Sequence, residues 1–144
     1  SVSTFDLTNV PILVGSDGEE LKVPVPDSSN FDMQFIPGTT QLIWTMEKAI
    51  GNVRDDHLYL FDYVTKKLSS LAVSDGATDL VPTASPDGQM IAWLRFYNEN
   101  KGYVLSGWND YQAKLIGGEI WVHDMITNQD RNTTLVGANV RFIP

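Results

Sequence analysis

The sequence has no cysteine among its 144 residues. This absence excludes a disulfide scaffold, a thiolate zinc site and a cysteine nucleophile. It leaves the cellular compartment open, because cysteine-free chains occur both in the reducing cytosol and in the periplasm.

Long apolar runs and a surplus of basic residues are also missing. No hydrophobic stretch approaches the roughly 18 residues needed to cross a bilayer, so we expect no membrane span. The chain carries 10 basic and 18 acidic residues, and its net charge of -8 repels phosphate backbones and anionic lipid surfaces. We therefore expect no nucleic-acid partner.

What the sequence does contain is a repeat. The segments "FIPGTTQLIW" (35–44) and "ASPDGQMIAW" (84–93) align without a gap, so that a turn proline and a strand tryptophan recur. The matched pairs are Pro37 with Pro86 and Trp44 with Trp93. A turn and the strand that follows it are therefore repeated.

A second strand repeats in the same order. "HLYLFDYVTKK" (57–67) aligns with "EIWVHDMITNQ" (119–129), which matches Asp62 with Asp124. Two further matches extend the repeat to both ends of the sequence, and the one at the N-terminal end is the weakest. They are "VRFIP" (140–144) with "MQFIP" (33–37), and "TFDLTN" (4–9) with "LFDYVT" (60–65).

Each unit is predicted to form four short strands. Runs rich in β-branched and aromatic residues are bounded by Pro, Asp, Gly and Asn, and no stretch keeps a helical period. In the second unit the strands are expected over residues 80–84, 89–96, 119–125 and 131–136. The predicted fold is therefore all-β, with antiparallel four-stranded sheets.

The turn before Trp93 has a mechanical explanation. Pro86 presets φ, Asp87 can bond the local backbone, and Gly88 takes a φ that other residues resist. Gly38 predicts a different turn geometry in the first unit. We expect these turns to be structural and to carry no chemistry.

The Ser-Pro-Asp-Gly turn, the strand ending "IAW" and the later "GEIWVHDMITNQ" resemble the TolB-type β-propeller blade. The resemblance implies a partial β-propeller and, since this blade occurs in periplasmic translocation proteins, a periplasmic or extracellular location. The implied division is residues 1–30 for the end of a preceding blade, 31–77 and 78–137 for two blades, and 138–144 for the first strand of another.

Fewer than three blades are present, whereas propellers usually close with about four to eight. Either the chain is a piece of a larger propeller, or copies close a ring by a head-to-tail contact. A differently wrapped small β domain is the remaining alternative. The expected partners are therefore further blades, from copies of the chain or from the rest of a parent chain.

The connection 97–118 in the second blade is much longer than its counterpart 47–56 and would share a rim with it. Its aromatic and small polar residues suit a binding surface for a protein or glycan. Alternatively, it folds into an extra hairpin with Tyr103 and Trp108 buried. The predicted binding residues are Tyr97, Tyr103, Trp108, Asp110, Tyr111, Asp55 and Asp56.

The rest of the sequence gives little support for a catalytic or metal-binding site. Asp55, Asp56 and His57 lack any recognised ligand spacing and are expected in a solvated loop, while His123 is expected to be packed and hydrogen-bonded in a strand. "SDGEE" (16–20) and "SDGATD" (74–79) are most simply turns. No Gly-x-Ser-x-Gly elbow is present, so we expect no catalytic residues, no metal and no cofactor.

Three functional hypotheses follow. The leading one is a non-catalytic scaffold or recognition module whose loop face binds a protein or glycan. The rival is part of the propeller of a larger hydrolase, such as a prolyl-oligopeptidase-type serine peptidase. A carbohydrate-active enzyme is the third, although no carboxylate pair can be assigned to it.

Overall fold

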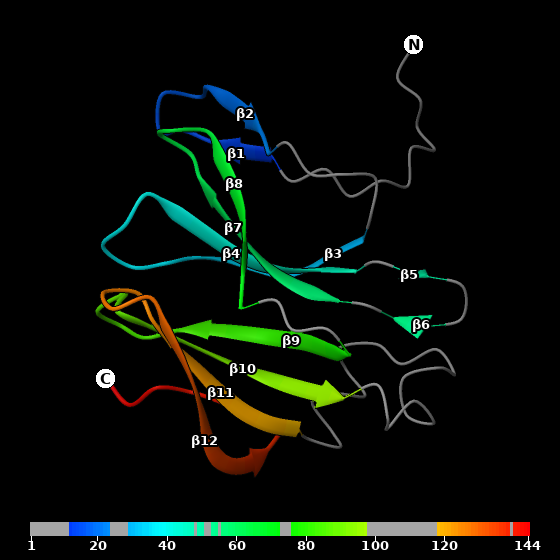
Figure 1. Ribbon diagram of the computed structural model, residues 1–144. Helices are drawn as coiled ribbons and strands as arrows, with labels where there is room; N and C mark the ends of the chain where they lie inside the picture. The colour runs from blue at the N-terminus through cyan, green and yellow to red at the C-terminus, as the bar shows by residue number, and fades with distance from the viewer. Residues whose placement is uncertain are drawn as a thin grey trace.

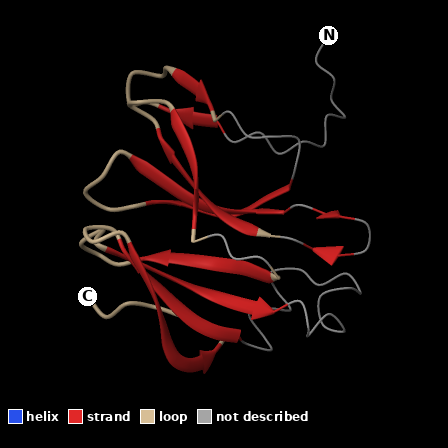
Figure 2. Cartoon of the chain, viewed as in Figure 1, coloured by secondary structure: helices blue, strands red, loops and turns tan. Residues whose placement is uncertain are grey.

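The computed structural model describes residues 12–23, 29–47, 49–50, 53–54, 56–72, 76–97, 118–138 and 140–144. These residues form strands and turns, without a helix (Figure 2). The predicted all-β class with antiparallel four-stranded sheets is confirmed. Within the described residues, accordingly, no helix long and apolar enough to span a membrane is found.

Two four-stranded antiparallel sheets make up the body of the protein (Figure 1). The first sheet contains, in spatial order, β3 (Ser29–Phe35), β4 (Gln41–Glu47), β7 (His57–Asp62) and β8 (Lys67–Leu71). The second contains, in chain order, β9 (Ala77–Ala84), β10 (Met90–Tyr97), β11 (Gly118–Asp124) and β12 (Gln129–Gly137). The sheets are stacked, and β9 contacts β3, β4 and β7.

Two short hairpins flank the first sheet. One consists of β1 (Ile12–Val14) and β2 (Glu20–Lys22), and the other of β5 (Ala49–Ile50) and β6 (Val53–Arg54). The β5–β6 hairpin follows the end of β4, whereas β1–β2 lies near the turn between β7 and β8 (Figure 1). The two hairpins therefore mark opposite ends of the first sheet.

The sequence repeat is also a repeat of strand register. Trp44 pairs with Tyr59 across β4 and β7, and Trp93 pairs with Trp121 across β10 and β11. The ring centroids are 6.3 Å apart in the first pair and 6.4 Å apart in the second. The two sheets are thus built on one pattern, with an aromatic pair at the same place.

The turn after the third strand is closed in the same way in both units. The Oδ1 atom of Asp62 accepts hydrogen bonds from the N–H groups of Val64 and Thr65, at 2.9 and 3.1 Å. Asp124 Oδ1 accepts the corresponding bonds from Ile126 and Thr127, at 2.8 and 3.0 Å. This local carboxylate-to-backbone bonding explains why aspartate recurs there.

The proline turns differ, as Gly38 predicted. The positive φ of 71° falls on Gly38 in the first turn and on Gly88, one aligned position later, in the second. Asp87 Oδ1 accepts a hydrogen bond from Gln89 N–H at 3.0 Å, as expected. Gly88 also lies against the first turn, because a Cβ atom there would be only 1.9 Å from the carbonyl oxygen of Pro37.

The core has three layers. Between the sheets lie Ile36, Ile43, Leu58, Leu60, Leu71, Ile91 and Trp93. The other face of the first sheet carries Leu42, Trp44, Met46 and Phe61 and is covered by Val23 and the β1–β2 hairpin. The other face of the second carries Leu80, Val81, Leu94 and Phe96, with Val140 packed against it. Each sheet therefore turns its repeat tryptophan toward its N-terminal neighbour.

The junctions between successive units also repeat. The Gln34 side-chain amide donates to the Pro82 carbonyl and accepts from Ala84 N–H at 3.3 Å. At the aligned position of the second unit, Thr83 Oγ1 donates to the Val140 carbonyl at 3.4 Å. Val140 thus lies against the second sheet much as β9 lies against the first. Among the described residues, 140–144 are not part of a strand.

Candidate functional site

The predicted binding residues are only partly described. Tyr97 ends β10 and Asp56 precedes β7, so both can be placed. The remaining predicted residues lie outside the described residues, namely Asp55, Tyr103, Trp108, Asp110 and Tyr111. The site is therefore built from the strand ends that carry the two connections.

These strand ends lie at one end of the molecule. The ends of β10 and β11 that flank the long connection are on the same side as the β5–β6 hairpin (Figure 1). The backbone joins them there, because Asp79 N–H in β9 donates to the Asp56 carbonyl at 2.8 Å. This arrangement is consistent with the common rim expected from the repeat.

Asp56 does not lie in a solvated loop. Asp56 is fully buried, and the neighbouring His57 is partly buried. The expectation of a solvated loop is therefore wrong for Asp56. The cause is tertiary, because β9 of the second sheet packs against the start of β7 and hydrogen-bonds the Asp56 backbone.

A buried ion pair forms the centre of this end of the molecule. Arg95 Nε and Nη2 donate to Asp79 Oδ1 and Oδ2 at 2.7 and 3.0 Å. Nη2 of the same guanidinium donates to the Ala72 carbonyl at 2.7 Å, just after β8 of the first sheet. Arg95 therefore links the second sheet to the end of the first.

Aromatic side chains enclose the pair. Trp93 Nε1 donates to Asp79 Oδ1 at 2.9 Å, so this carboxylate is bonded by both the indole and the guanidinium. The Arg95 guanidinium carbon lies 4.3 Å from the centroid of the Trp121 ring. Stacking on tryptophan is a favourable environment for a guanidinium with few contacts to water.

The electrostatics follow from burial. Burial raises the pKa of Asp79, and the Arg95 guanidinium and the Trp93 indole oppose that shift. At the rim, burial and a hydrogen bond to Glu119 raise the pKa of the Tyr97 phenol. Asn132 Nδ2 also donates to Glu119, at 3.2 Å. The base of the long connection is therefore braced by side chains from three strands.

The ion pair is suited to holding structure rather than to turning over a substrate. Asp79 is fully buried and Arg95 is 5 % exposed. The Asp79 carboxylate accepts its hydrogen bonds from the Trp93 and Arg95 side chains. His123 is packed and bonded to Asp130 at 2.6 Å, as predicted. No group of three or more histidine, aspartate or glutamate side chains within the described part of the chain is placed to hold a metal ion.

Sequence reasoning missed Asp79 and Arg95 as a pair. The available signal was a charged residue inside each of two otherwise apolar strands, "ATDLVPTA" and "MIAWLRFY". Charges in such strands are rarely buried without a partner. A search for the partner across the predicted hairpin would have matched them, since Arg95 and Asp79 are register neighbours.

No protein-family model matches the chain, and a search of curated proteins finds no matching sequence.

Proposed function

We propose that the chain is a non-catalytic scaffold and recognition module built from TolB-like propeller blades. The observation that carries this proposal is the repeated junction between units. Gln34 and Thr83 stand at aligned positions and each donates to a carbonyl of the next unit, Pro82 and Val140. A chain with such junctions extends by adding units to one side.

A head-to-tail stack of this kind determines where the connections between strands emerge. Each sheet presents the same face to its N-terminal neighbour, so equivalent connections emerge at one common rim. Rigid strands that display variable connections at one rim are a common arrangement for binding. The proposed location is periplasmic or extracellular, as expected for this type of blade.

The proposed recognition surface is the rim that carries the connection 97–118. The connection starts and ends at braced residues, because Tyr97 is bonded to Glu119 and Gly118 packs closely on Phe96. A Cβ atom on Gly118 would lie 2.9 Å from Phe96 Cζ. Aromatic side chains have few rotatable bonds and therefore lose little entropy when they bind a protein or glycan surface.

The test is a binding screen on defined glycan and peptide arrays. The wild type is compared with the Trp108→Ala/Tyr111→Ala double variant and with Ile126→Ala, a control at an exposed turn on the opposite end. We expect ligands that bind the wild type and the control and that bind the double variant at least about tenfold more weakly. Binding that the double variant leaves unchanged contradicts the rim, and cleavage of any array member contradicts the non-catalytic role.

A further inference from the structure

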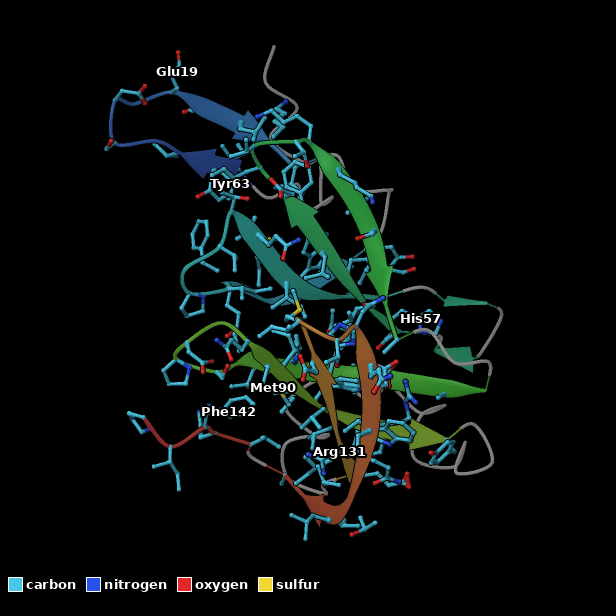
Figure 3. All side chains as sticks on the ribbon, turned by 60° about the vertical axis from the view of Figure 1, so that its left-hand side comes forward. Glu19, His57, Tyr63, Met90, Arg131 and Phe142 are labelled. Carbon is cyan, nitrogen blue, oxygen red and sulfur yellow. The ribbon has the colours of Figure 1, made fainter. Side chains whose placement is uncertain are left out.

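A pocket lies at the opposite end of the first sheet, away from the rim just described. Its volume is about 430 Å³, within the range of roughly 300–1,000 Å³ that is usual for small-ligand sites. Figure 3 shows Glu19, on the loop between β1 and β2, above Tyr63, which follows β7. The pocket is lined by residues of the β1–β2 hairpin together with Phe35, Tyr63 and Lys66.

The walls of the pocket are apolar and aromatic. The Phe35 and Tyr63 rings meet edge to face, with centroids 6.3 Å apart, and Phe35 is 59 % exposed. Leu13 and Leu21 are partly buried, and both pack on the core beneath the β1–β2 hairpin. The walls are therefore fixed to the core on one side and expose an aromatic surface on the other.

The rim of the pocket is negatively charged. Asp17, Glu19 and Glu20 contribute three exposed carboxylates, against one ammonium group from Lys66. The Lys66 ammonium already donates to the Tyr63 carbonyl at 2.7 Å. Together with the net charge of -8, this rim favours a cation over an anion or a neutral group.

Three residues that line the pocket are not repeated in the second unit. Ala84, Met125 and Asn128 stand at the positions aligned with Phe35, Tyr63 and Lys66. Ala84 and Met125 pack against the core between the two sheets. The aromatic walls are therefore a specific feature of the first unit, and the repeat alone does not explain them.

We propose that this pocket binds an arginine or lysine side chain from an extended segment of a partner polypeptide. The carboxylates of the rim attract the cationic end, and the exposed Phe35 ring offers an aromatic surface for a cation–π contact. The apolar walls contact the methylene stem of the same side chain. The proposal stands apart from the rim at the other end of the molecule.

The test is an NMR titration of the isotope-labelled full chain with a capped pentapeptide, Gly-Gly-Arg-Gly-Gly. The same peptide with lysine, citrulline or glutamate at the centre provides the comparisons. We expect saturable shifts of the amides of residues 15–20 and 63–66 with the arginine and lysine peptides. We expect at least about threefold weaker binding with citrulline, which keeps the shape of arginine but lacks its charge.

Three variants separate local recognition from general charge. Glu19→Gln/Glu20→Gln should weaken binding at least about threefold, and Lys66→Asn should strengthen it about twofold. Asparagine is a conservative choice because Asn128, at the aligned turn position, has a φ of 57°, close to the 61° of Lys66. Phe35→Ala leaves the charge unchanged and should weaken binding about two- to fivefold. Ile126→Ala is the control and should have no effect.

Several outcomes would overturn the proposal. If the citrulline peptide binds as tightly as the arginine peptide, charge plays no role in recognition. If Phe35→Ala binds as tightly as the wild type, the pocket wall does not contact the peptide. Shifts spread over the whole surface mean general attraction to an acidic protein. Tighter binding of the glutamate peptide means that the pocket takes an anion.

Discussion

The two sheets share a register and differ in what surrounds the repeated tryptophan. In the first sheet the positions around Trp44 are apolar, and the hairpin β1–β2 covers them. In the second sheet three of the aligned positions are charged or polar. The aligned pairs are Met46 with Arg95, Phe61 with His123 and Leu68 with Asp130.

The difference teaches how one backbone pattern supports two kinds of interface. Apolar burial stabilises without direction, so it suits the small hairpin over the first sheet. The buried ion pair of the second sheet has a fixed geometry, and Arg95 also bonds the Ala72 carbonyl after β8. We infer that this pair sets the orientation of the two large sheets more than it raises their stability.

The largest expected effect comes from breaking the ion pair on one side. Asp79→Asn leaves the buried Arg95 without a counter-charge and should lower the free energy of unfolding by about 3–5 kcal/mol. The measurement is chemical denaturation of the wild type and the variant.

The matched control replaces the buried ion pair of the second sheet with two apolar side chains. Asp79→Leu/Arg95→Met places at position 95 the methionine found at the aligned Met46. If the pair mainly sets orientation, the double variant should recover most of the lost stability. A double variant as unstable as Asp79→Asn would show that the pair contributes stability that apolar packing cannot replace.

A smaller effect is expected from the two turn glycines, which have the same φ of 71° and different surroundings. Gly38→Ala has open space within 4 Å and should cost about 1–2 kcal/mol of left-handed strain. Gly88→Ala adds a clash with the Pro37 carbonyl and should lower the free energy of unfolding by about a further 1–3 kcal/mol. Equal losses of unfolding free energy would mean that the two turns do not touch in solution.

The smallest effect concerns the aspartates that close the turns, where the two units should behave alike. The Thr65 N–H group lowers the pKa of Asp62, and the Thr127 and Ile126 N–H groups lower that of Asp124. A pKa that is lower in the folded state gives stability that is present above the unfolded value of about 3.9. This stability is lost as the pH falls through the folded pKa.

The corresponding measurement is the unfolding midpoint between neutral and acid pH. Asp62→Asn and Asp124→Asn should each flatten the acid part of the curve, and by similar amounts, because each carboxylate accepts two backbone hydrogen bonds. A large effect in one unit alone would show that the turns are not equivalent in solution.

Much of the fold could be predicted because its signals are local. Turn residues such as Pro86 and Gly88 punctuate short apolar strands, and the four strands predicted in the second unit are all present at 77–84, 90–97, 118–124 and 129–137. The extra β5–β6 hairpin was not predicted, since its strands are only two residues long. The burial of Asp56 was missed because it depends on contact with β9.

The sequence by itself determined the repeat, the all-β class and the chemistry of the turns, because residues close in the chain decide φ, strand length and turn closure. Only the tertiary structure decided which charges are buried together, where Gly88 meets Pro37, and that Phe35 and Tyr63 line an acidic pocket. Those features join residues that are distant in the chain. Their proximity depends on how the two sheets and the hairpin pack, and that information is not carried by any short stretch of sequence.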